Sequence, residues 1–101
     1  MKLLLSCFIL LPFARADIEA SIVFIDAKNS FFVIDKGKKD GLGADFDYDV
    51  VRKAADGTTS TVGTGNFEKF LGQDLMSKLK VDDGSIGKLQ IGDRVVCRRK
   101  G

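Results

Sequence analysis

Asp45-Phe46-Asp47-Tyr48-Asp49-Val50 is the stretch that decides the fold of this chain, because acidic and apolar residues alternate along it without a break. Successive side chains of a β-strand point to opposite faces of the sheet, so this pattern predicts a strand with one buried face and one face in water. Asp56-Gly57 follows as a hairpin turn, and residues 58–64 are rich in β-branched side chains. The centre of the chain is therefore predicted to be a β-hairpin.

Further strands are predicted on both sides of this hairpin. Residues 18–25 alternate between apolar and polar and become more apolar in their second half. Residues 31–34 form a short β-rich run that pairs back across a turn at residues 26–29. Near the C-terminus, Gly92-Asp93 introduces a last strand at residues 94–98, in which Val95 and Cys97 share one face. The two ends of the chain are thus also predicted to be extended.

Two stretches give a weaker signal. Residues 66–81 contain one apolar group with helical spacing and another that fits one face of a strand, so we expect a strand at each end and an irregular corner near Gly72. The first group is Phe67, Phe70 and Leu71, and the second is Leu75, Leu79 and Val81. Leu75, Met76 and Leu79 also have helical spacing. Residues 37–43 hold three glycines, which predicts a surface connection without regular structure.

The expected fold class follows from the number and spacing of these segments. Five or six short strands separated by glycine turns predict an all-β domain, either a small closed barrel or a sandwich. A chain of this size makes one domain with one modest core, burying about 60% of the surface that the unfolded chain exposes. Closure into a barrel would also hide the strand edges, which otherwise invite aggregation.

The first sixteen residues have the three parts of a secretory signal peptide. Lys2 supplies the positive charge, an apolar run at residues 3–11 is interrupted only by Ser6, and Pro12 precedes Ala14-Arg15-Ala16. A membrane-spanning helix needs roughly 20 apolar residues, so the run is too short for one. We expect cleavage after Ala16, which leaves residues 17–101 as a single β-barrel-like domain in the periplasm or outside the cell.

An alternative for this segment is lipoprotein processing. Leu4-Leu5-Ser6-Cys7 resembles the box in which the cysteine is acylated. The apolar run continues for four residues past Cys7, however, which favours ordinary cleavage after Ala16.

Removal of the signal peptide changes the composition that matters for function. Of sixteen basic residues, Lys2 and Arg15 lie in the signal, whereas all fourteen acidic residues follow it. The mature chain is therefore formally neutral, and its charge does not indicate a nucleic-acid or membrane-surface binder. No later stretch is apolar enough to predict a transmembrane segment. Cys97 is the one cysteine left, so no disulfide within the mature chain is expected.

The residues yield no catalytic, cofactor-binding or metal-binding set. No histidine exists to activate the Cys97 thiol, so that cysteine is interpreted as a small buried residue, with a covalent dimer as the alternative. The three aspartates at residues 45–49 suggest a calcium loop, but Val50 stands where such a loop needs glycine, so a solvated strand face is favoured. The glycines and lysines of residues 37–43 match neither a phosphate-binding loop nor a dinucleotide fingerprint.

The order of turns and apolar positions resembles a class of small β-barrel modules of bacterial envelope proteins, of which the C-terminal domain of flagellar assembly protein T is one example. The matching residues are Ile34-Asp35-Lys36-Gly37, Gly41-Leu42, Asp45-Phe46, Tyr48, Val50, Arg52, Val62-Gly63 and Ile91-Gly92-Asp93-Arg94-Val95. The chain departs from the pattern at Ala44 and over residues 66–79. Modules similar to these serve as structural or docking pieces, and the resemblance implies such a role here.

The leading functional hypothesis is therefore a noncatalytic, exported module that binds an envelope protein or itself. A small secreted hydrolase that uses two carboxylates is the first alternative. A calcium-binding module is the second, since oxygen-ligated ions are the only metals that a chain with one cysteine and no histidine readily holds. The contact surface is expected at an open strand edge or a barrel end, where loops cluster.

Overall fold

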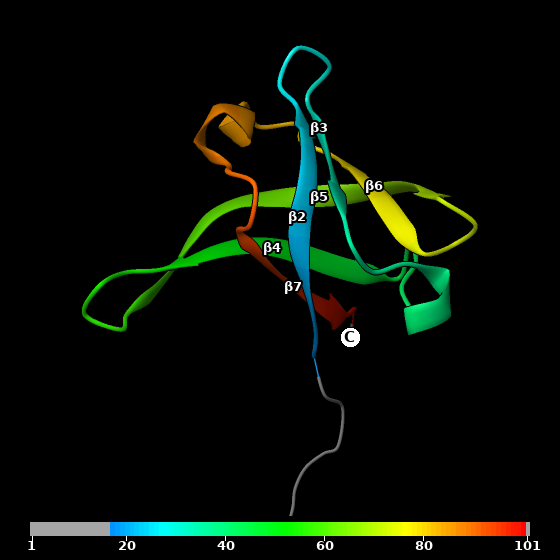
Figure 1. Ribbon diagram of the computed structural model, residues 1–101, viewed down its shortest axis with the longest axis horizontal. Helices are drawn as coiled ribbons and strands as arrows, with labels where there is room; N and C mark the ends of the chain where they lie inside the picture. The colour runs from blue at the N-terminus through cyan, green and yellow to red at the C-terminus, as the bar shows by residue number, and fades with distance from the viewer. Residues whose placement is uncertain (1–16, 101) are drawn as a thin grey trace, which may run out of the picture.

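A computed structural model describes residues 17–100 of the chain, so the predicted signal peptide at residues 1–16 lies outside the described residues. The described part is all-β, as predicted, with six strands and two short 3₁₀-helices (Figure 1). In chain order these are β2 (Ile18–Asp26), β3 (Phe31–Ile34), η2 (Lys38–Asp40), β4 (Phe46–Lys53), β5 (Thr59–Leu71), β6 (Met76–Lys80), η3 (Ser85–Lys88) and β7 (Arg94–Arg99).

The six strands close into a barrel in the order β2-β3-β6-β5-β4-β7, and every pairing is antiparallel. Of the two predicted architectures, the barrel is the one that forms. β4 lies between β7 and β5, and Tyr48 is paired with Cys97 on one side and Gly65 on the other. Each strand therefore has two neighbours, so no open edge runs along the barrel wall in the described residues.

The alternation that predicted β4 is the alternation that fills the barrel. Phe46, Tyr48 and Val50 point inward and are buried, and Val95 and Cys97 of β7 meet them there, as predicted. The other fully buried side chains of the core are Ile22, Phe32, Ile34 and Leu79. Burial of apolar area, at about 25 cal/mol per Å², is the main source of stability for residues 17–100, whose single cysteine is free.

The leucines that follow the two short helices, Leu42 after η2 and Leu89 after η3, are both buried in the core. The expectation that residues 37–43 lack regular structure was wrong for Lys38–Asp40. The Asp40 carboxylate accepts a hydrogen bond from the Gly37 N–H at 2.9 Å, and the Asp40 N–H donates to the Gly37 carbonyl at 2.9 Å. These reciprocal bonds stabilise one helical turn, and Gly41 ends it with a left-handed φ of 94°.

The ambiguous stretch forms two strands and a turn, as predicted. β5 is longer than expected and continues to Leu71, and β6 begins at Met76. Gly72, Gln73 and Asp74 all have left-handed φ angles, which reverse the chain between the two strands. Leu75 was predicted to fit one strand face together with Leu79 and Val81, but it precedes β6 and is 51% exposed.

The β4–β5 hairpin extends beyond the barrel wall (Figure 1). The pairing of β4 with β7 ends at Val51 and Arg94, whereas Arg52 and Lys53 pair only with Ser60 and Thr59 of β5. The loop at residues 54–58 therefore projects from the body of the molecule. No helix within residues 17–100 is long and apolar enough to cross a membrane.

Candidate functional site

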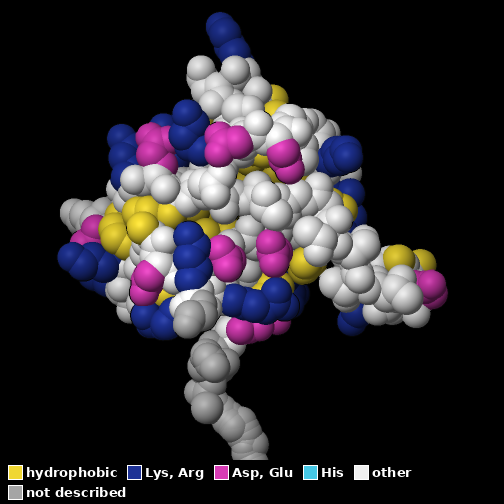
Figure 2. Space-filling view, turned by 180° about the vertical axis from the view of Figure 1, so that it is seen from behind, with side chains coloured by type: hydrophobic (Ala, Val, Ile, Leu, Met, Phe, Trp, Pro, Cys, Tyr) yellow, Lys and Arg dark blue, Asp and Glu magenta, His cyan; other side chains and the backbone are white. Residues whose placement is uncertain are grey.

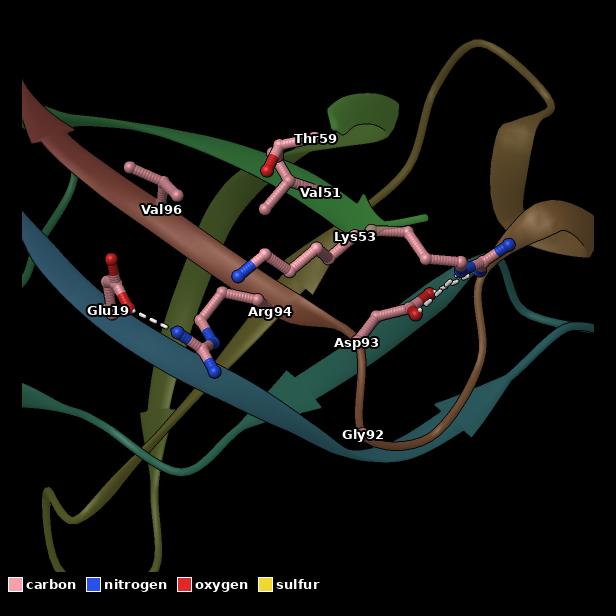
Figure 3. A pocket seen from close by; sticks show the side chains of 9 residues that line it. Glu19, Val51, Lys53, Thr59, Gly92, Asp93, Arg94 and Val96 are labelled. Atoms are coloured by element: carbon pink, nitrogen blue, oxygen red, sulfur yellow. Dashed lines mark hydrogen bonds and ion pairs between the residues drawn. The ribbon is translucent and has the colours of Figure 1, made fainter. Parts of the chain in front are cut away.

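A hollow of about 450 Å³ lies on the outer face of β2, β7 and β4, beside the root of this hairpin. We call it the outer groove. Figure 3 shows the side chains that line it, which come from β2, from β7 and from both strands of the hairpin. The lining includes the side chains of Glu19, Val51, Lys53, Thr59, Arg94 and Val96. These residues alternate with the inward-facing residues of the same strands, so the pleat that builds the core also builds the groove.

One end of the outer groove is closed by an ion pair between Arg52 and Asp93. The Arg52 guanidinium donates from Nε to Asp93 Oδ1 at 2.9 Å and from Nη2 to Oδ2 at 2.6 Å, and Nη2 also donates to the Lys88 carbonyl at 2.8 Å. The Gln90 N–H donates to the same carboxylate at 2.8 Å. With Asp93 only 7% exposed, this pair fixes the turn before β7 to the hairpin.

The hydrogen bonds to Arg52 hold the pKa of the Asp93 carboxyl below its ordinary value, and the same bonds raise the pKa of the Arg52 guanidinium. Both groups are therefore charged at neutral pH and already use their strongest contacts on each other. The predicted role of Gly92-Asp93 as a turn that starts a strand is confirmed, with the addition that Asp93 is also the partner of Arg52.

The remaining charges of the groove are not balanced. Arg94 Nη1 donates to Glu19 Oε1 at 2.6 Å, and both side chains are more than half exposed. The Lys53 side chain takes part in none of the ion pairs or side-chain hydrogen bonds found among residues 17–100. In Figure 3 the Lys53 side chain extends away from Asp93 and toward Arg94. The lining thus holds three cations and two carboxylates, with Lys53 as the uncompensated charge.

The predicted aspartate face of β4 is confirmed as a strand face that points away from the core. Asp49 accepts from Arg98 at 3.3 Å, Asp45 accepts from Arg99 at 2.7 Å, and Asp17 also accepts from Arg98, at 3.0 Å. Arginines of β7 therefore pair with Asp45 and Asp49, two of the three aspartates of this stretch. Within residues 17–100, no group of three or more potential metal-ligating side chains is placed to hold an ion.

The Cys97 thiol and the Tyr48 ring are both buried. Cys97 is fully buried, and its burial raises the pKa of the thiol to about 12. Burial likewise raises the pKa of Tyr48 to about 12, and its hydroxyl donates to the Gly43 carbonyl at 2.6 Å. Hydrogen bonds lower the pKa of Asp26, Asp56, Asp83 and Asp93, the opposite of what a general acid at neutral pH needs.

The glycine loop at residues 37–43 holds an internal carboxylate where a phosphate would have to bind. The Gly37 N–H, the donor at the start of η2, is occupied by Asp40. The Asp40 carboxylate therefore stabilises the turn of the loop itself.

Sequence reasoning missed the outer groove because its residues come from separate strands and share no motif spacing. The Arg52–Asp93 pair did carry a signal. By alternation, Arg52 falls on the same side of β4 as the buried Tyr48 and Val50. A cation on the apolar side of a strand requires a partner, and Asp93 is that partner.

Comparisons with known proteins do not identify this chain: no protein-family model matches it, and neither does a curated protein or a solved structure. The resemblance to the envelope barrel modules therefore stays a prediction.

Proposed function

We propose that residues 17–101 are an exported, noncatalytic module that docks to a protein of the bacterial envelope through the outer groove. The observation that supports this most is the groove itself, a hollow with two half-buried valines, Val51 and Val96, at its base and charged side chains around its rim. An apolar centre with a polar rim is the usual composition of a protein contact surface.

Figure 2 shows that, on the face seen from behind, acidic and basic side chains are interspersed and apolar patches are small and separate. Such mixed charge is typical of a face that stays in water. A docking role at the groove also agrees with the chemistry of its charged groups, because Arg52, Asp93, Glu19 and Arg94 are held in ion pairs.

Export is the part of the proposal that rests on residues 1–16. Mass spectrometry of the protein recovered from the periplasm or the medium tests it. We expect a mature N-terminus at Asp17, whereas a lipid-modified Cys7 would replace this proposal with lipoprotein anchoring.

Docking is tested by a photo-crosslinking amino acid placed at Thr59, on the rim of the outer groove. The matched control position is Lys80, an exposed residue of β6, which is not a neighbour of β2, β7 or β4 in the barrel. In the envelope of the bacterium that encodes the chain, we expect a discrete crosslinked protein from position 59 and none from position 80. Equal products from both positions, or no product from position 59, would overturn docking at this groove.

A further inference from the structure

We infer that the outer groove recognises a carboxylate side chain in an acidic segment of the partner protein, an inference that rests on the proposed docking function. The carboxylate binds between the Lys53 ammonium and the Arg94 guanidinium. An apolar side chain next to it in the partner covers Val51 and Val96.

The charge of the groove argues for an anionic ligand. Glu19 compensates Arg94, whereas Lys53, whose side chain extends toward Arg94 in Figure 3, has no counter-ion in the described residues. Arg94 uses only Nη1 toward Glu19, so its other guanidinium nitrogens make no hydrogen bond within residues 17–100. Free ammonium and guanidinium donors in the lining of one groove match a carboxylate, which accepts several charge-assisted hydrogen bonds.

The base of the groove argues for a peptide rather than a free anion. Val51 and Val96 lie on β4 and β7 and are only partly buried by the protein itself. A free anion would leave these side chains in water, whereas a segment with an apolar residue beside its acidic one would bury them. The Thr59 hydroxyl at the rim adds an uncharged donor for the backbone of such a segment.

The mode of binding is a charge contact at an exposed surface, so a modest affinity is expected. The test therefore uses ¹⁵N NMR titration of the purified protein with a capped peptide, acetyl-Ser-Val-Glu-Val-Ser-amide. The matched ligands are the same peptide with glutamine in place of glutamate, and inorganic phosphate.

The glutamate peptide should shift the amides of Val51, Lys53 and Val96. Because hydrogen bonds to charged groups are worth at least about 1.5 kcal/mol, it should bind about tenfold more tightly than the glutamine peptide.

Three variants separate the groove from general charge attraction. Lys53→Met should weaken glutamate-peptide binding about fivefold, the upper range for an exposed ion pair. Lys53→Arg should retain binding. Lys80→Met removes one positive charge from β6 and should leave the affinity unchanged.

Several results would overturn the carboxylate assignment: equal binding of the two peptides, equal weakening by Lys53→Met and Lys80→Met, or phosphate shifting the same amides with the same affinity as the glutamate peptide. If position 59 nevertheless gives its crosslinked partner, docking at the groove stands and only the carboxylate chemistry falls. If position 59 gives no product, the docking function itself falls.

Discussion

Gly65 shows at the scale of one residue why the barrel closes around its core. It faces inward from β5, where a Cβ would lie 2.8 Å from Cζ of Phe32 and 3.0 Å from Cβ of Leu79. Both neighbours are fully buried and have no free volume into which to move. The absence of a side chain at Gly65 is therefore what lets β5 lie against the Phe32 ring.

We predict that Gly65→Ala destabilises the protein by about 1–3 kcal/mol, the usual cost of overpacking a core. Urea denaturation measures the change in the free energy of unfolding. Gly87→Ala is the matched control, because no atom lies within 4 Å of the added Cβ and the position is outside the barrel wall. It should change stability by less than about 0.5 kcal/mol. Equal losses in the two variants would mean that the Phe32 contact does not limit the packing.

The Arg52–Asp93 pair acts at the scale of the elements, because it joins the β4–β5 hairpin to the turn that precedes β7. The native pKa of Asp93 is lowered, so its carboxylate favours the folded state above the unfolded-state pKa of about 3.9. That contribution is lost as the pH falls through the native pKa. The pair therefore adds to the acid sensitivity of the protein.

We predict that Asp93→Asn lowers the free energy of unfolding at pH 7 by about 1–2 kcal/mol, since Arg52 and the Gln90 N–H lose a charged acceptor. The variant should also lose less stability than the wild type between pH 7 and pH 2.5, as measured by urea denaturation. Asp26, Asp56 and Asp83 remain, so a smaller dependence on pH persists. Asp47→Asn is the control, because Asp47 makes no ion pair within residues 17–100. An Asp93→Asn variant with the pH profile of the wild type would contradict the prediction.

The elements were predictable wherever a local pattern dictates them. β4 was evident from the alternation at residues 45–50, and Cys97 was placed in the core because it shares a face with Val95. The turn of η2 was missed because it depends on a specific contact between the Asp40 carboxylate and the Gly37 backbone, not on periodicity. Leu75 was misplaced because three left-handed residues before it change the direction of the chain.

The outer groove belongs to the whole molecule and could not be predicted from the sequence. Glu19, Lys53 and Arg94 lie far apart in the chain and become neighbours only because β7 is inserted between β2 and β4 when the barrel closes. Strand order is set by long-range pairing, which no local pattern in the sequence records. A candidate site built on one stretch, such as the aspartates of residues 45–49, was visible, but two of its three carboxylates, Asp45 and Asp49, are paired with arginines of β7.

Cys97 reports on the opening of the whole molecule, because its thiol is fully buried and its pKa is raised to about 12. A disulfide reagent reacts with the thiolate, which is scarce in the folded protein at pH 8. We predict that 5,5′-dithiobis(2-nitrobenzoic acid) labels the native protein only through unfolding, while urea-unfolded protein is labelled at once. Where unfolding is in fast equilibrium, each 1.4 kcal/mol by which Gly65→Ala lowers the free energy of unfolding should accelerate labelling about tenfold. Rapid labelling of the native wild type, or a Gly65→Ala rate that does not follow its stability, would show that Cys97 is reached without global unfolding.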